Sequence, residues 1–116
     1  MSPETSPQFS TATELAQRVR NGEISSRQLM ENHLKEIERL NPQVNAIVNL
    51  DIDGALQRAE AADDAQAKGR PLGPLHGLPI AHKDLALTQG MRTTFGSPLF
   101  AEFIPKQSAL IVERLR

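Results

Sequence analysis

Apolar side chains recur every three or four residues near the start of the chain and predict a first short helix. Leu15 and Val19 lie four residues apart and therefore on one face of a helix. Thr11 and Glu14 have the spacing of a capping box, in which each side chain satisfies a backbone amide of the first turn. Gly22 supplies the left-handed residue that commonly ends a helix.

A second, stronger apolar stripe predicts a longer helix. Ser25 and Gln28 repeat the capping-box spacing, and Ile24 is placed to pack on Leu29 as a hydrophobic staple. The Asn-Pro step at 41–42 is expected to end this helix, because a residue that precedes proline avoids the helical conformation. The residues of the stripe are Leu29, Met30, His33, Ile37 and Leu40.

The middle of the chain alternates between predicted strands and one alanine-rich helix. The β-branched residues of 44–50 predict a strand. Asp51 or Asp53 can cap a third helix that runs to about Lys68 and is closed by Gly69.

The last third of the chain predicts loops, one more strand and a final helix. Residues 70–79 contain three prolines and two glycines and predict a rigid irregular loop. Residues 79–87 predict a short strand, and residues 91–100 a second loop. Ser108 is expected to cap a last helix. Its predicted apolar face consists of Leu110, Ile111 and Leu115.

These elements predict an α/β protein of two or three helices and a few short strands, incomplete as a domain. The chain has 116 residues, is 39% hydrophobic, and contains four Phe but no Trp or Tyr. Since a free-standing domain usually packs more large side chains, we expect residues 11–116 to lean on further protein. Residues 1–10 are rich in Ser, Thr and Pro without any period, and are expected to form a mobile N-terminus.

Charge and cysteine content exclude several classes of function. Thirteen basic and fourteen acidic residues give a net charge of −1 and no basic footprint for nucleic acid. The absence of cysteine excludes a disulfide framework and cysteine-ligated zinc. No signal peptide and no apolar stretch approaching the roughly 20 residues of a membrane span is present, so a cytoplasmic protein is expected.

Lys83 stands at the end of the second predicted strand, where a solvated charge has no reason to be. A lysine that is held neutral there is a competent general base, able to activate a nearby serine. The alternative is a lysine that pairs with Asp84 or extends its charged end to water. From the residues alone this plainer interpretation is favoured, because most lysines are surface charges.

The loop that follows offers hydroxyl groups and flexible backbone close to that strand end. Thr94 and Ser97 carry hydroxyls, as does Thr93, and Gly96 permits close backbone approach or a positive φ. These groups suit an acyl-transfer site, but they are also the parts of an ordinary turn.

The histidines and the acidic pair of the third helix predict no metal site. His33 is expected to be a half-buried packing residue, and His76 a structural or solvent-exposed loop residue. His82 would point away from the site that Lys83 serves, because neighbouring strand residues face opposite sides. Asp63 and Asp64 are adjacent on a helix and cannot converge on one ion, so a solvated face is expected.

Two stretches together resemble the N-terminal part of the amidase signature family. They are GPLHGLPIAHKDL at 73–85 and GMRTTFGS at 90–97. Members of this family typically show G-x-P-[IV]-x-x-K-D, followed by a T-T-x-G-S loop. The flanking helices and the LNPQVNAIV stretch agree, so the resemblance extends over residues 11–116.

The resemblance implies an α/β fold with a mixed sheet covered by helices, and a Ser–Ser–Lys triad that hydrolyses a small-molecule amide to a carboxylate and an amine. Lys83 would be the general base, and Thr94, Gly96 and Ser97 would lie near the substrate. The family needs no metal or organic cofactor. The even charge predicts no nucleic-acid partner, the lack of a long apolar stretch predicts no membrane partner, and a homodimer of the full-length enzyme stays open.

The serines of the triad are not supplied by these residues. The Gly/Ser-rich signature of the family follows the last residue of this chain, so the chain is expected to be truncated before it and inactive alone, because the triad acts as a unit. Two other interpretations stay open. One is a non-catalytic binding or assembly module, and the other is part of an aminoacyl-tRNA amidotransferase subunit. The LHGLP and AHKDL motifs and the lack of a basic surface speak against the second.

Overall fold

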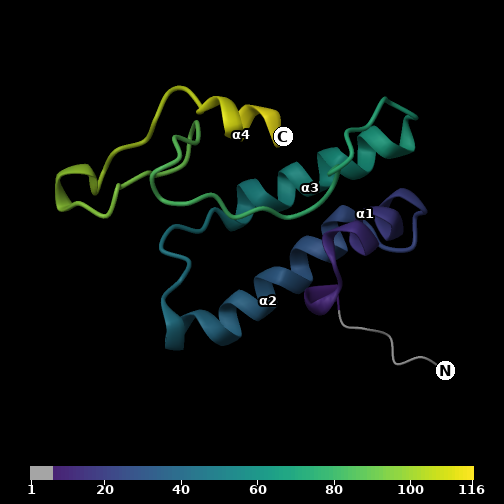
Figure 1. The fold of residues 1–116 in the computed structure, drawn as a ribbon, viewed down its shortest axis with the longest axis horizontal. Coiled ribbons are helices and arrows are strands. Elements are labelled where there is room, and N and C mark those ends of the chain that lie inside the picture. Colours follow the sequence, from purple (N-terminus) through teal and green to yellow (C-terminus); the bar gives the residue numbers. More distant parts are fainter. Residues whose placement is uncertain (1–6) are drawn as a thin grey trace. The chain divides into compact units, whose positions relative to one another are not determined.

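The structure, a computed structural model, describes residues 7–116 and is helical. In that part of the chain the elements are η1 (Pro7–Phe9), α1 (Ala12–Arg20), α2 (Ser26–Val44), α3 (Ile52–Ala67), η2 (Pro98–Phe100) and α4 (Leu110–Arg114), as Figure 1 shows. They fall into two compact units. The first unit contains the residues up to 44 together with 52–79, and the second contains 45–51 together with 80–116.

The N-terminal prediction falls mostly outside the described residues. Residues 1–6 are not described, so the expected mobility of that stretch stays a prediction. Residues 7–9 form one turn of 3-10 helix, an element that the sequence pattern did not indicate.

Helix α1 begins and ends as its sequence predicts. The Thr11 hydroxyl accepts the Glu14 amide at 3.2 Å, and the Glu14 carboxylate accepts the Thr11 amide at 2.9 Å. Gly22 has a φ of +73° at the other end. The amides of Gly22 and Glu23 donate to the carbonyls of Val19 and Arg18, which is the Schellman pattern.

The start of α2 is confirmed, and its end lies further on than predicted. Ser25 and Gln28 form the expected capping box, with both bonds at 3.0 Å. The helix continues through Pro42 to Val44, so the predicted end was wrong. Proline removes one amide near the last turn, but its own φ suits a helix. The left-handed φ of +48° at Asn45 follows the last helical residue.

A small apolar cluster holds the first unit together. Leu29 is fully buried and Val19 is 2% exposed. Ile24, predicted to staple onto Leu29, is buried in the same cluster, with Leu15, while Leu78 from the 70–79 loop packs against it. Leu40 of the predicted stripe is instead 41% exposed.

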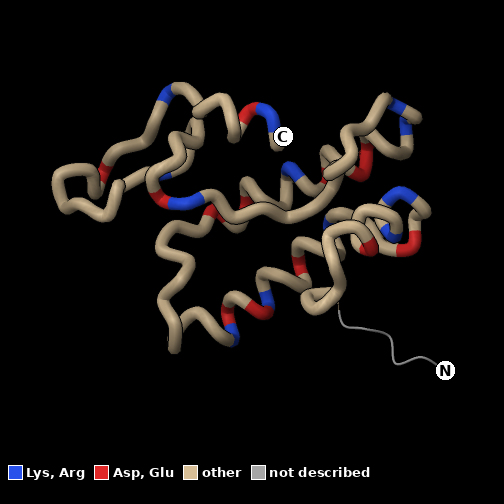
Figure 2. The backbone as a smooth tube through the Cα atoms, viewed as in Figure 1, with Lys and Arg blue, Asp and Glu red and all other residues tan. Residues whose placement is uncertain are grey.

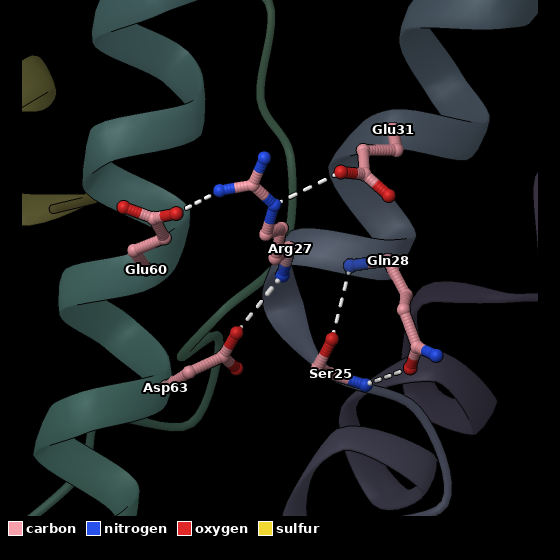
Figure 3. Close-up of polar contacts among 6 residues, drawn as sticks. All are labelled: Ser25, Arg27, Gln28, Glu31, Glu60 and Asp63. Atoms are coloured by element: carbon pink, nitrogen blue, oxygen red, sulfur yellow. Dashed lines mark hydrogen bonds and ion pairs between the residues drawn. The ribbon is translucent and has the colours of Figure 1, made fainter.

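Helices α2 and α3 lie side by side and are joined by polar contacts (Figure 3). The Asp63 carboxylate on α3 accepts the backbone amides of Ser26 at 2.7 Å and Arg27 at 3.1 Å. The Arg27 guanidinium bridges Glu31 on its own helix and Glu60 on α3. The expectation that Asp63 lies on a solvated face was therefore wrong: it is half-buried and caps the N-terminus of a neighbouring helix.

The predicted strands at 44–50 and 79–87 are wrong, since residues 7–116 contain no strand. In the second unit, three backbone hydrogen bonds join residues 87–93 to 103–109 in the antiparallel sense: Ala109 to Leu87, Gly90 to Pro105 and Thr93 to Phe103. These hydrogen bonds are about three residues apart along the chain. In an antiparallel ladder, every second residue forms a pair of hydrogen bonds with the residue opposite it. A β-branched sequence favours an extended backbone, but a strand forms only where its backbone N–H and C=O groups pair with those of another segment. The mixed sheet is thus not formed by the described residues.

The last helix is also built differently from its prediction. Ala109, not Ser108, is the N-cap of α4, and it provides no side-chain cap. The Ser108 hydroxyl instead accepts the amide of Gln89 at 2.9 Å. The buried residue of α4 is Val112, while Leu110 and Ile111 of the predicted apolar face are more than half exposed. No helix within 7–116 is long and apolar enough to cross a lipid bilayer.

Candidate active-site loop around Lys83

Lys83 begins a tight turn in the second unit instead of ending a strand. Its carbonyl accepts the amides of Leu85 at 2.7 Å and Ala86 at 2.9 Å, so the backbone reverses over the next two residues. The side chain of Lys83 is exposed. A lysine on a turn is free to reach toward whatever covers that surface, whereas a strand end would have fixed its direction.

The neighbouring carboxylate of Asp84 does not neutralise this lysine. Among residues 7–116 the structure shows no ion pair for Lys83. Both carboxylate oxygens of Asp84 are occupied by other donors. Of the two plainer interpretations, the Lys83–Asp84 pair is absent from this part of the chain, whereas a charged end that extends to water agrees with the exposed side chain.

Asp84 binds two other segments of the second unit, an arrangement that we call the Asp84 clamp. Its Oδ1 accepts the amide of Thr94 at 2.8 Å and the side-chain amide of Asn49 at 3.3 Å. Its Oδ2 accepts the Thr94 hydroxyl. Its backbone carbonyl accepts the amide of Phe95 at 2.9 Å. Residues 45–51 and 93–97 are thus both tied to the turn that carries Lys83.

These hydrogen bonds also decide the charge state of Asp84. The Thr94 hydroxyl, then the Thr94 amide, and more weakly Asn49 and the Gly96 amide, hold the pKa of Asp84 below its ordinary value. Donors that point at a carboxylate stabilise its charged form. Asp84 therefore accepts hydrogen bonds as an anion at neutral pH.

The structure brings the predicted loop residues close to the lysine turn, with different environments. The Thr94 hydroxyl donates to Asp84 and accepts the Gly96 amide at 3.3 Å, so it is committed within the loop. Gly96 has a φ of +66° and open space where a Cβ would stand, so conformation and not close approach favours glycine there. The Ser97 hydroxyl accepts the Leu99 amide at 3.3 Å and caps η2.

Of the histidines, two have structural roles. His33 is half-buried as predicted, and its Nδ1 donates to the Leu29 carbonyl at 2.8 Å, since that oxygen can only accept. His76 is half-buried and donates from Nε2 to the Ala62 carbonyl at 2.9 Å, which fixes the 70–79 loop against α3. The strand geometry expected for His82 is not formed. The described residues contain no cluster of three or more His, Asp or Glu side chains that could hold a metal ion.

Asn49 is the residue of the clamp that sequence reasoning missed. It lies 35 residues before Asp84, in a stretch interpreted as a strand. The available signal was a polar amide in a largely apolar, β-branched run, which contains a second asparagine, Asn45. Such a side chain needs a partner when it is partly buried, but the sequence does not show which one.

Comparison with known proteins identifies the family. The amidase family matches residues 28–116, a range that includes Lys83, the Asp84 clamp and the 93–97 loop. The chain belongs to the amidase family. Its fold is a part of the amidase signature fold, and the K-D and T-T-x-G-S motifs lie within the matched residues.

The amidase relatives are much longer than this chain. A glutamyl-tRNA(Gln) amidotransferase subunit of Synechococcus sp. strain CC9605 is 43% identical over 99 residues, which are 85% of this chain and 20% of that protein. The corresponding protein of Streptomyces coelicolor is 40% identical over 106 residues, which are 91% of this chain and 21% of that protein. The chain spans about a fifth of the length of these relatives.

Solved structures show the same arrangement of the backbone. A chain from a vestigial protein complex, described as revealing the origins of an s-triazine catabolic enzyme, has a TM-score of 0.86 at 30% identity. The match covers 91% of this chain and 23% of that one. A bacterial aryl acylamidase of the amidase signature family has a TM-score of 0.76 at 30% identity, covering 81% of this chain and 20% of that enzyme.

Proposed function

We propose that this chain supplies the general base, Lys83, to an amidase domain that hydrolyses a carboxylic amide. The observation that carries the proposal is an exposed lysine without an ion pair within 7–116, inside the stretch that matches the family, beside a carboxylate engaged elsewhere. A base must have a free lone pair, and a lysine already bound to its neighbouring aspartate would be a poor one.

The mechanism follows the resemblance. The neutral amine of Lys83 takes a proton from a bridging serine, which deprotonates the nucleophilic serine as that serine attacks the amide carbonyl. The proton taken up by Lys83 passes back through the bridging serine to the departing nitrogen, the amine leaves, and water then hydrolyses the acyl-enzyme to the carboxylate. Both serines belong to the Gly/Ser-rich segment of a complete domain.

The 94–97 loop is proposed to border the substrate, with different roles for its residues. The Thr94 hydroxyl serves the Asp84 clamp. Gly96 and Ser97 come next along the loop, and the Ser97 hydroxyl proton stays available after its oxygen has capped η2. We therefore expect Ser97, more than Thr94, to contact a substrate. No metal or organic cofactor is needed for this chemistry.

The 116-residue chain alone is proposed to lack activity, because a base without nucleophile and oxyanion donors does not run the triad mechanism. A hybrid amidase therefore provides the test. In it, this chain replaces the matching segment of the bacterial aryl acylamidase, and release of the aryl amine is measured. We expect the hybrid to turn over an aryl acylamide and the chain alone not to.

Lys83→Ala in the hybrid is expected to lower kcat by at least about 100-fold, the contribution of a positioned general base. Lys106→Ala is the matched control, because Lys106 is an exposed lysine of the same unit that lies outside the proposed site. Turnover of Lys83→Ala near the level of the control would show that Lys83 is not the base. The alternative of a non-catalytic assembly module would then gain support.

A second candidate function is that of an aminoacyl-tRNA amidotransferase subunit. This function is favoured by the relatives that are 39–43% identical to the chain, because they are named glutamyl-tRNA(Gln) amidotransferase subunits. Against it, Figure 2 shows basic and acidic residues interspersed along the backbone of the first unit, and the chain has thirteen basic against fourteen acidic residues. Assays of a complete domain that contains this chain, with a glutamyl-tRNA and with simple amides as substrates, distinguish the two functions. Transfer of ammonia to a glutamyl-tRNA favours the amidotransferase, and hydrolysis of simple amides without tRNA favours the general amidase.

A further inference from the structure

We infer that Asp84 is a positioning residue, whose carboxylate holds the turn of Lys83 against the 93–97 loop and the 45–51 segment. The inference rests on the proposed function, because it concerns how the base is placed. It assigns Thr94 and Asn49 to the support of Lys83 and not to the binding of substrate.

The geometry of the clamp carries this inference. Three donors converge on one carboxylate, from residues 35 positions before it and 10 positions after it. The carbonyl of the same residue accepts the Phe95 amide, so side chain and backbone of Asp84 are both bound to one loop. The side-chain contact and the backbone contact together restrain the rotation of the turn as well as its distance from the loop. Lys83 precedes Asp84 directly, so its backbone is restrained with it.

The shape of the loop depends on the same contacts. Phe95 has a φ of +54°, an unusual conformation for a residue with a side chain. Its amide is held by Asp84, and its ring packs edge-on against Phe100 at 5.1 Å and stacks on Phe103 at 6.3 Å between centroids. The surrounding contacts therefore maintain a backbone that would otherwise relax. Gly96 and Ser97 follow this residue, so the clamp sets where the loop meets the lysine.

An anion at position 84 strengthens the clamp. Thr94 presents both an amide N–H and a hydroxyl to the two oxygens, and Asn49 presents an amide N–H. Asparagine at this position would replace one accepting oxygen by a donating NH₂, so the Thr94 hydroxyl would have to turn from donor to acceptor, and the charge-assisted hydrogen bonds would become weaker neutral ones. Asp84→Asn therefore weakens the clamp while it keeps the volume of the side chain.

Hydrogen exchange of the 116-residue chain tests the clamp without reference to activity. In Asp84→Asn and Thr94→Val we expect the Thr94 and Phe95 amides to exchange at least about 10-fold faster at neutral pH, because their acceptors are weakened or displaced. Thr88→Val is the matched control. Thr88 is also buried, but its hydroxyl donates to the Ala86 carbonyl and not to Asp84. Unchanged exchange in Asp84→Asn would overturn the inference.

Kinetics of the hybrid amidase test the role of the clamp in catalysis. Asp84→Asn and Thr94→Val are expected to lower kcat about 100-fold, because a displaced base impairs the chemical step. Their KM should change less than about threefold, whereas loss of a substrate contact would raise KM. Thr94→Ser keeps the hydroxyl and should recover most of the lost kcat, and Thr88→Val should behave as the unsubstituted hybrid.

The outcomes separate this inference from the proposed function. If Lys83→Ala is inactive while Asp84→Asn and Thr94→Val keep the original kcat, the positioning role is wrong and the base stands. If Thr94→Val raises KM and leaves kcat unchanged, Thr94 binds substrate and the positioning role is also wrong. If Lys83→Ala is active, the proposed function fails first, and the role of the clamp in placing a base fails with it.

Discussion

At the scale of single residues, Gly77 is the most constrained position of the first unit. Its φ is +78°. A Cβ built there would lie 2.2 Å from the Ser26 hydroxyl oxygen and 3.0 Å from Cγ1 of Val19. Both neighbours are buried, and the Ser26 hydroxyl has no hydrogen-bond partner among the described residues. Glycine thus lets the 70–79 loop close over the apolar cluster at a point where no side chain fits.

Gly77→Ala and Gly22→Ala separate conformational strain from crowding. Gly22 has a similar φ of +73° but open space around it. We expect Gly22→Ala to lower the free energy of unfolding by about 1–2 kcal/mol, from the left-handed conformation alone. Gly77→Ala should cost about 1–3 kcal/mol more, because it also overpacks the cluster. Hydrogen exchange of the α1 and α2 amides measures both losses as changes in the free energy of opening of the first unit, and equal losses would contradict the crowding at Gly77.

Asp84 gives the second unit a predictable dependence on acid. Its pKa is lowered in the folded chain by the Thr94 hydroxyl first, then by the other donors of the clamp. The clamp is therefore fully formed above the ordinary aspartate pKa of about 3.9, and is lost as the pH falls through the lowered value.

An NMR titration of the Asp84 carboxyl group, with the Thr94 amide as reporter, checks this dependence. The midpoint should lie below about 3.9 in the unsubstituted chain and move toward that value in Thr94→Val. The Thr88→Val control should leave it in place. A midpoint at or above the ordinary value in the unsubstituted chain would show that the clamp does not form.

At the scale of elements, the start of α2 depends on two different caps. Ser25 and Gln28 form the local one, within a single turn. Asp63 of α3 supplies the other, and accepts two amides that the local cap leaves free. A carboxylate at a helix N-terminus also interacts favourably with the helix dipole. The ion pairs of Arg27 with Glu31 and Glu60 are exposed and contribute little to stability.

Asp63→Ala is expected to lower the free energy of unfolding by about 1–2 kcal/mol, the usual cost of a lost N-cap. Asp64→Ala removes the adjacent carboxylate, which is exposed, and should change stability by less than about 0.5 kcal/mol. Hydrogen exchange of the α2 amides in the two variants measures the difference. Equal effects would mean that the contact between α2 and α3 does not depend on this cap.

At the scale of the whole molecule, buried apolar residues are few and unevenly distributed. Leu15, Val19, Ile24 and Leu29 form the cluster of the first unit, and Val112 is the buried aliphatic residue of the second. Many large apolar side chains remain exposed. They include Leu99 at 90%, and Val48, Ile80, Leu85, Ile104, Leu110 and Ile111 at 53% or more. This number of exposed large apolar side chains agrees with a chain that spans about a fifth of the length of its relatives.

The isolated chain is therefore expected to unfold with low cooperativity and to bind a hydrophobic dye. Slow amide exchange should be concentrated in α1 and α2, where the buried cluster lies, and at the Thr94 and Phe95 amides that the Asp84 clamp holds, and be weak elsewhere in 80–116. Calorimetry, dye fluorescence and hydrogen exchange measure the three properties. One sharp thermal transition without dye binding would contradict this expectation, and would indicate a self-sufficient domain.

Much of the first unit could be predicted from the sequence, because its signals are local. The capping boxes at Thr11 and Ser25, and the staple of Ile24 on Leu29, join residues three to five positions apart. The helix ends at Gly22 and Gly69 were predictable because each depends on a positive φ at a single glycine. The resemblance to the amidase family was equally local, since it lay in two short motifs, and the family match confirms it.

Contacts between residues that are far apart in the sequence could not be predicted and are seen only in the folded chain. Apolar runs predicted strands, yet a strand exists only where another segment pairs with it, and residues 7–116 form isolated bonds instead of a ladder. Asp63 was interpreted as a solvated charge because the amides that it caps lie 36 and 37 residues away. The family and the starts of α1 and α2 follow from the sequence alone, and the role of Lys83 as a general base stays a prediction. The contacts that restrain the turn of this lysine come from the tertiary structure. The hydrogen bonds that join Asn49, Asp84 and Thr94 form only when segments that are distant in the sequence come together.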